Sequence, residues 1–236
     1  MRMQTILFFL CGALIISCSE KKQDKPEIEK GPVSETDTFY LGDKLVQVEK
    51  ATKAEFDKLD SIVFDTSEVQ NLLADSSSVK RKGDTLFFSI SNNRKVTLVN
   101  NYADDDDTYV SYSYLGFMKD IDQFLVFGVY YEWYNYLLID KQTGDTTITC
   151  GDPVVSPNKK YFICGNADLE ARFTFNGFEL YENTHKPKLV NSRELGKWGP
   201  EMIKWLDNET MLARCSISDT AAKNLIRTDY FKLKIK

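Results

Sequence analysis

The chain has 236 residues, and its 30 lysines and arginines are outnumbered by 35 aspartates and glutamates, which gives a formal net charge of −5. So mild an acidic balance provides neither the basic patch that binds nucleic acid nor the polybasic segment that binds anionic lipid. Aromatic residues make up 13% of the chain. This content favours strands in packed sheets over a helical bundle, and we expect no nucleic acid among the partners.

The first 18 residues combine an apolar run with a small residue and a cysteine. Residues 6–16 are apolar or small and follow the single positive charge of Arg2. This run is shorter than the about 20 residues of a membrane-spanning helix, and it fits the apolar core of a secretory signal peptide. Residues 14–18, Leu-Ile-Ile-Ser-Cys, resemble a bacterial lipobox, with the small Ser17 directly before Cys18.

The resemblance to bacterial lipoproteins implies that residues 1–17 are a signal peptide and that Cys18 is lipidated after cleavage. Two or more acyl chains anchor a protein stably to a membrane without a transmembrane helix. The residue after the cysteine is Ser19 and not aspartate, which favours the outer membrane in the sorting rule of such lipoproteins. The alternative is an ordinary signal peptide with an incidental Cys18.

Residues 19–37 contain no aromatic residue, and Ile28 and Val33 are their only aliphatic residues. Such a stretch buries too little apolar surface to offset the entropy lost on ordering. We therefore expect residues 18–37 to be the lipidated cysteine with a flexible tether. Residues 38–236 are expected to form a single domain.

Strand patterns dominate the expected domain. A helix is predicted over residues 52–59, where Thr52 and Glu55 have the spacing of a capping box, and a second short helical turn is compatible with residues 68–73. Residues 141–145 are typical of a hairpin loop, with Gly144 for the turn. The predicted strands are residues 85–90, 96–99, 109–117, 124–131, 134–139 and 146–149.

The second half of the chain repeats a strand pattern. The opening strands of the repeat are residues 122–126, 159–163 and 208–212, and the strands that follow are residues 136–140, 177–182 and 230–233. Repeats of this length with several short strands are typical of propeller blades. Residues 153–162, Pro-Val-Val-Ser-Pro-Asn-Lys-Lys-Tyr-Phe, resemble the Ser-Pro-Asp-Gly-Lys opening of WD40-like blades. Lys159 stands where that family has glycine, and no Trp-Asp pair closes a blade.

The resemblance covers residues 105–236 and extends to uncharacterised propeller-like bacterial lipoproteins. It implies an all-β, propeller-like fold of four to five small blades or an incomplete arc, preceded by a short helix. A β-sandwich is the alternative, because the same strand spacing permits it.

Residues suited to catalysis are scarce. His185 is the single histidine and lies in a predicted hairpin turn, which argues against a Ser-His-Asp triad and against a histidine-based metal site. The cysteines of the expected domain are Cys150, Cys164 and Cys215. They allow at most one disulfide, with three candidate pairings, and they lack Cys-x-x-Cys spacing. Free, buried cysteines are the simpler interpretation.

Two acidic loops are candidates for a calcium site or a hydrolytic site. Residues 104–107 are four aspartates without the spacing of an EF-hand, so a solvated loop is favoured over a calcium site. Asp168 and Glu170 lie in a second polar loop, and paired carboxylates carry out glycoside hydrolysis when they face each other across a cleft. We expect no catalytic residues, no metal and no cofactor.

The densest aromatic patch is residues 130–136. Aromatic side chains there are expected to pack between repeats, or to form a binding platform at a rim. The candidate binding residues are Tyr131, Trp133 and Tyr134, together with Trp198, which lies in a Gly- and Pro-rich stretch and is expected to be exposed.

These features favour a non-catalytic, lipid-anchored module that binds a protein or glycan partner in the cell envelope. One alternative is a hydrolase that uses carboxylates on the blade loops. A convergent acidic cleft with raised carboxyl pKa values would favour the hydrolase, and a flat aromatic rim would favour binding. Another alternative is an immunity or inhibitor lipoprotein that neutralises a toxin in the periplasm.

Overall fold

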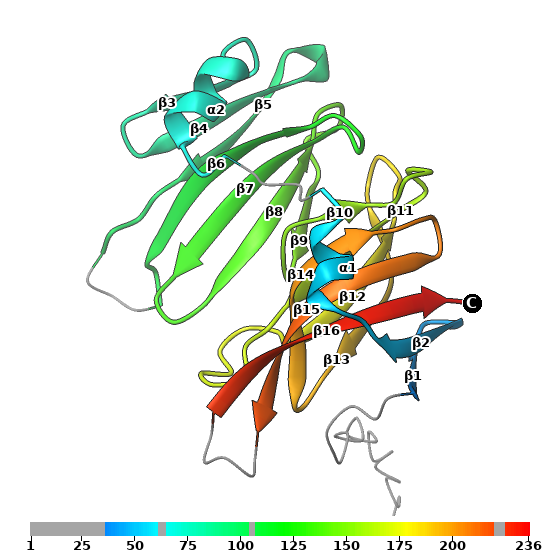
Figure 1. The fold of residues 1–236 in the computed structure, drawn as a ribbon. Coiled ribbons are helices and arrows are strands. Elements are labelled where there is room, and N and C mark those ends of the chain that lie inside the picture. The colour runs from blue at the N-terminus through cyan, green and yellow to red at the C-terminus, as the bar shows by residue number, and fades with distance from the viewer. Residues whose placement is uncertain (1–35, 61–64, 104–106, 220–224) are drawn as a thin grey trace, which may run out of the picture.

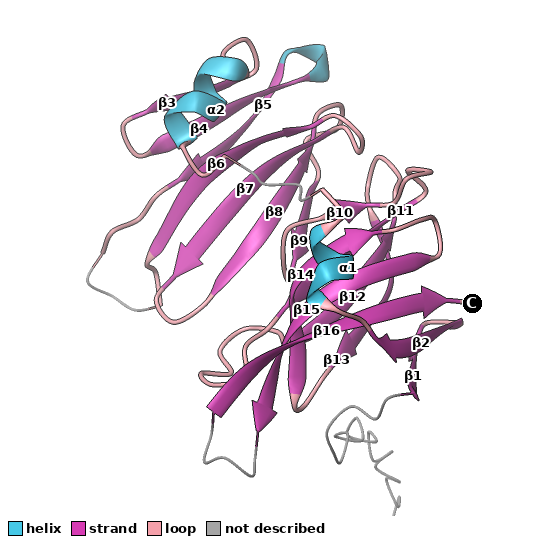
Figure 2. Ribbon diagram, in the orientation of Figure 1, coloured by secondary structure: helices cyan, strands magenta, loops and turns pink. Residues whose placement is uncertain are grey.

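The computed structural model describes residues 36–60, 65–103, 107–219 and 225–236. Within these ranges the chain is mostly β, with strands arranged in four antiparallel sheets and little helix (Figures 1 and 2). The all-β expectation is confirmed. Cys18, most of the predicted tether and Asp104 to Asp106 lie outside the described residues.

Helix α1 (Lys53–Asp57) follows the predicted capping box. Thr52 accepts a hydrogen bond from the backbone N–H of Glu55, and the Glu55 carboxylate accepts one from the backbone N–H of Thr52. The ammonium group of Lys204 donates to the carbonyl oxygens of Phe56 (3.0 Å) and Leu59 (2.7 Å), which fastens the helix to a neighbouring sheet. Helix α2 (Glu68–Ala74) agrees with the second predicted helical turn.

The first sheet along the chain is the β3–β5 sheet. It comprises β3 (Val79–Lys82), β4 (Thr85–Ile90) and β5 (Arg94–Val99), joined as a meander. A single 3-10 turn, η1 (Ser91–Asn93), connects the last two strands.

The next two sheets are four-stranded meanders. The β6–β9 sheet comprises β6 (Val110–Met118), β7 (Gln123–Tyr130), β8 (Tyr134–Asp140) and β9 (Thr146–Thr149). The β10–β13 sheet comprises β10 (Val154–Val155), β11 (Tyr161–Asn166), β12 (Gly177–Glu182) and β13 (Lys188–Glu194). The strands predicted between residues 85 and 149 are therefore confirmed, with ends shifted by two residues or fewer.

The last sheet joins the two ends of the described chain. It has the order β1 (Thr36–Leu41), β2 (Lys44–Lys50), β16 (Leu225–Ile235), β15 (Thr210–Asp219) and β14 (Trp198–Trp205). We call it the terminal sheet. Strand β2 takes the place beside β16 that β9 and β13 occupy in the preceding sheets (Figure 1). Strand β1 begins at Thr36, so it includes the last two residues of the predicted tether.

The four sheets pack face to face in chain order. One buried cluster joins the β3–β5 and β6–β9 sheets, a second joins the β6–β9 and β10–β13 sheets, and a third joins the β10–β13 and terminal sheets. Within β7, Phe124 and Val126 enter the first cluster and Leu125 enters the second. Side chains of a strand alternate between faces, so strands buried on both faces read as continuous apolar runs.

The predicted repeat is confirmed in position. Its three opening strands become β7, β11 and β15, each the second strand of its meander, and the strands that follow become β8, β12 and β16. Lys159 has φ +57°, the left-handed conformation that glycine would favour at this turn. Lys159 adopts this conformation, so the turn forms here without a glycine.

Candidate functional site

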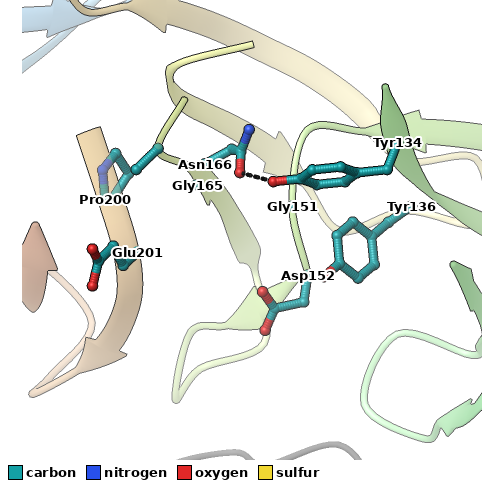
Figure 3. Close-up of a pocket in the computed structure, with 9 residues that line it drawn as sticks. Tyr134, Tyr136, Gly151, Asp152, Gly165, Asn166, Pro200 and Glu201 are labelled. Carbon is teal, nitrogen blue, oxygen red and sulfur yellow. Dashed lines mark hydrogen bonds between the residues drawn. The ribbon is translucent and has the colours of Figure 1, made fainter. Parts of the chain in front are cut away.

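A polar cavity of about 250 Å³ lies where three sheets meet (Figure 3). Its walls come from the start of β8, the link between β9 and β10, the end of β11, and β14. The lining residues are Tyr134, Tyr136, Gly151, Asp152, Gly165, Asn166, Ala167, Pro200 and Glu201. None of these carries a positive charge.

Two glycines bring the walls of the cavity together. A Cβ atom added to Gly151 would lie 2.1 Å from the carbonyl oxygen of Gly165, and one added to Gly165 would lie 2.7 Å from the Cγ atom of Pro200. The hydroxyl of Thr149 donates to the carbonyl oxygen of Gly151 (2.8 Å) and holds the link in place. At Gly151 the neighbouring backbone leaves no room for a side chain, and at Gly165 the Pro200 and Ile203 side chains would have to shift.

The tyrosines of the cavity remain neutral hydroxyl groups. Burial is the main cause that raises the pKa of both Tyr134 and Tyr136. The Tyr134 hydroxyl donates to the Oδ1 atom of Asn166 (2.8 Å). The Asn166 amide donates in turn to the Oγ1 atom of Thr174 (2.9 Å) and to the carbonyl oxygen of Phe175 (2.7 Å). This chain ties the cavity wall to the loop that joins β11 and β12.

The two carboxylates of the cavity have different surroundings. Burial raises the pKa of Asp152, and no salt bridge to this side chain occurs in the part of the chain that the structure describes. Glu201 accepts a hydrogen bond from the Nε atom of Arg214 (2.9 Å) and another from the Ser216 hydroxyl. Among the described residues, Asp152 therefore has no ion-pair partner, whereas Glu201 is paired with Arg214.

The predicted aromatic platform lies on the β7–β8 hairpin beside the cavity. Tyr134 lines the cavity. Tyr131 and Trp133 are 58% and 43% exposed in the preceding turn. The rings of Tyr130 and Trp133 stack with their centroids 3.8 Å apart and their planes 2° from parallel. A flat stacked aromatic pair, of which Trp133 is exposed and Tyr130 is half-buried, thus adjoins a polar cavity.

The expectation that Trp198 is exposed is wrong. Its side chain is 2% exposed and packs against Phe39, Phe178 and Phe231 in the core of the terminal sheet. Trp198 begins β14 and is not part of a loop. It therefore cannot belong to a surface platform.

The other residues considered from the sequence, namely His185, Asp168 and the three cysteines, do not line the cavity. The His185 side chain is 66% exposed in the turn between β12 and β13, as predicted. Asp168 accepts hydrogen bonds from its own loop and does not line the cavity. Cys150, Cys164 and Cys215 are free thiols, and burial is the main cause that raises the pKa of each.

Over the described ranges, no group of three or more His, Cys, Asp or Glu side chains is arranged to hold a metal ion. No helix in the same ranges is long and apolar enough to cross a membrane.

A wider groove of about 640 Å³ lies between α2 and the second half of β6. Its polar side chains serve the fold. Asp75 accepts a hydrogen bond from the Tyr114 hydroxyl (2.7 Å), and Asn71 donates to the carbonyl oxygen of Asp65 (2.6 Å). The smaller cavity is therefore the better candidate site.

Of the five polar side chains that line the cavity, sequence reasoning identified only Tyr134 and missed Tyr136, Asp152, Asn166 and Glu201. A signal was present in the dipeptides Gly151-Asp152 and Gly165-Asn166, each a glycine followed by a polar residue at or beyond a strand end. Glu201 has no comparable signal, because it lies within β14.

Comparison with protein-family models, with curated proteins and with solved structures finds no match to this chain.

Proposed function

We propose that this protein is a lipid-anchored, non-catalytic module of the cell envelope that binds a glycan at the cavity and the adjoining hairpin. The observation that supports the proposal is that the exposed Trp133, stacked on the half-buried Tyr130, directly precedes Tyr134, which lines the polar cavity. A sugar ring has an apolar C–H face and a polar edge. Flat aromatic rings suit the face, and a few convergent polar groups suit the edge.

The test is glycan binding by variants of the exposed hairpin. We expect Trp133→Ala to weaken binding at least tenfold, because an exposed tryptophan at a binding surface typically contributes more than about 1–2 kcal/mol. Tyr40→Ala is the matched control, since Tyr40 is 62% exposed on β1 and does not line the cavity. Equal binding by wild type and Trp133→Ala, measured by titration calorimetry, would contradict a glycan site at this hairpin.

The proposed anchor is Cys18, and the proposed location is the outer membrane. The support comes from the sequence of residues 14–18. We expect Cys18→Ala to move the protein from the membrane fraction to the soluble periplasmic fraction, because the acyl chains hold it at the bilayer. Retention of that variant in the membrane fraction would refute the anchor.

We also propose that the four sheets form an open arc of propeller type. The support is that the sheets pack face to face in chain order and that β2 supplies the fourth strand of the last repeat. A β-sandwich is the alternative description, because each adjacent pair of sheets shares a core. An experimental structure in which the β6–β9 and β10–β13 sheets share no buried cluster would exclude the arc.

One observation favours a second candidate, a carboxylate-dependent hydrolase. Asp152 has a raised pKa and lines the same cavity as Glu201, whose charge is paired (Figure 3). Carboxylates in contrasting environments are typical of acid–base pairs in glycoside hydrolysis. Release of reducing ends from a bound glycan, abolished in Asp152→Asn, would favour hydrolysis over binding alone.

A further inference from the structure

We propose that the cavity binds a primary ammonium group paired with Asp152, so that the glycan of the proposed function, on which this inference rests, is an amino sugar with a free amine. Neither the lipid anchor nor the aromatic hairpin requires this chemistry. It follows from the charges and the shape of the cavity.

The first step is the charge balance of the lining. Of the nine lining residues, two carry a carboxylate and none is a lysine, arginine or histidine. Arg214 and Ser216 already occupy the oxygens of Glu201. Asp152 accepts a hydrogen bond from its own backbone, but it has no ion-pair partner among the described residues. A positively charged ligand group would therefore pair with Asp152, and an anionic one would be repelled.

The second step is the arrangement around Asp152. Figure 3 shows the Asp152 and Tyr136 side chains lying together at one wall of the cavity, opposite Glu201. Burial is the main cause that raises the pKa of Tyr136, and the charge of Asp152 adds to it. An ammonium group at this wall meets a carboxylate and lies near an aromatic ring, a combination that favours cations.

The third step is size. At about 250 Å³ the cavity lies just below the range of about 300–1,000 Å³ that is usual for drug-sized ligands. It therefore accommodates one ring or one short amine-bearing group, and the remaining rings of an oligosaccharide extend toward the exposed Trp133.

The experiment compares three probes on the full-length protein in non-ionic detergent. The probes are a β-1,4-linked glucosamine tetramer, the matching N-acetylglucosamine tetramer and cadaverine. We expect the free-amine tetramer to bind at least tenfold more tightly than the acetylated one. Asp152→Asn, which keeps the size of the side chain, should remove this preference, whereas Asp145→Asn, at an exposed carboxylate that does not line the cavity, should retain it.

The outcomes separate this inference from the proposed function. Equal affinity for the two tetramers, or an unchanged preference in Asp152→Asn, would overturn the ammonium site and leave the glycan proposal in place. Binding of cadaverine with no binding of either tetramer would support the ammonium site and overturn the glycan proposal. No binding of any probe would overturn the ammonium site. Circular dichroism of each variant confirms that the fold is intact.

Discussion

Asp168 organises the loop beside the cavity. Its Oδ1 atom accepts a hydrogen bond from the backbone N–H of Arg172 (2.8 Å). Its Oδ2 atom accepts from the N–H groups of Phe173 and Thr174 (2.8 Å each) and from the Thr174 hydroxyl (3.0 Å). Thr174 in turn accepts a hydrogen bond from Asn166, which lines the cavity. One carboxylate therefore links the loop to the site.

The Asp168 carboxylate should make the loop sensitive to acid. Burial acts to raise the pKa of this group, but the hydrogen bonds from Thr174, Arg172 and Phe173 outweigh it, and the net pKa is lowered. A lowered folded-state pKa means that the stabilisation is complete above the unfolded value of about 3.9 and is lost as the pH falls through the folded value.

We expect Asp168→Asn to destabilise the protein at pH 7 by about 1 kcal/mol or less, because the group is only partly buried and solvent screens its charge. At pH values below the lowered folded-state pKa, the variant and the wild type should converge. Thermal unfolding at a series of pH values measures this difference. A constant difference across the series would show that ionisation of Asp168 contributes nothing.

Gly151 is the residue at which the cavity tolerates substitution least. A Cβ atom there would lie 2.1 Å from the carbonyl oxygen of Gly165, a backbone atom that cannot move aside. We expect Gly151→Ala to cost about 3 kcal/mol or more by overpacking. Gly83→Ala is the control, since a Cβ atom there meets nothing within 4 Å and only the φ of +55° opposes it, at a cost of about 1–2 kcal/mol. Urea denaturation compares the two variants, and equal costs would contradict this account.

At the scale of elements, β6 shows how an edge strand is covered. It lies at the edge of the β6–β9 sheet, where unpaired backbone groups invite association with another chain. Side chains satisfy several of these groups. Glu68 accepts a hydrogen bond from the Tyr114 N–H (2.8 Å), and Arg81 donates to the Tyr112 carbonyl oxygen (2.6 Å). Glu68 and Arg81 also form a two-point ion pair, with both contacts at 2.7 Å.

Loss of this ion pair should expose the strand. We expect Glu68→Gln to destabilise the protein by about 2 kcal/mol, because Arg81 loses its charged partner while it is still partly buried. Hydrogen exchange of the β6 amides should also become faster. Lys53→Gln, which breaks an exposed ion pair with Asp57, should leave both measurements unchanged. If the two substitutions changed stability and hydrogen exchange equally, Glu68 would stabilise the protein no more than an exposed surface charge does.

The positions of the strands were predicted better than the exposure of individual side chains on them. Strands β7 and β8 are recognisable because they bury both faces and read as near-continuous apolar runs. Strand β4 buries alternate residues on one face only, and its Thr, Phe and Ile residues are typical of strands. Trp198 was misplaced because the stretch Gly196-Lys197-Trp198-Gly199-Pro200 has loop composition. Pro200 is tolerated in β14 because this is the edge strand of the terminal sheet and carries a bulge beside the proline.

At the scale of the whole molecule, distant segments meet in ways that a linear pattern does not contain. The cavity combines residues of β8, β11 and β14, and only the packing of three sheets brings Tyr134, Asp152 and Glu201 together. Strands β1 and β2 were not predicted. They pair with each other as a local hairpin, but β2 joins the sheet through β16, which is separated from it by most of the chain. The repeats were predictable because each one pairs within itself.

Removal of residues 36–50 tests the terminal sheet. Without β1 and β2, the edge of β16 and the cluster that contains Val46 and Val48 would be uncovered. We expect the shortened protein to self-associate, because an uncovered hydrophobic edge strand is an aggregation site. Addition of a peptide of residues 36–50 should restore the monomer by strand addition. Size-exclusion chromatography measures both effects, and a shortened protein that stays monomeric without the peptide would contradict the role of β2.

The pairing of β2 with β16 also sets an order of events during synthesis. The β6–β9 and β10–β13 sheets consist of neighbouring hairpins, so they can form as soon as their own residues have emerged. The early segment that becomes β2 has to wait until almost the last residue of the chain has been made. Folding therefore starts in the middle and finishes at the two ends. The edge of β16 therefore stays unpaired until β2 docks on it, and until then the last sheet is open to association with another chain.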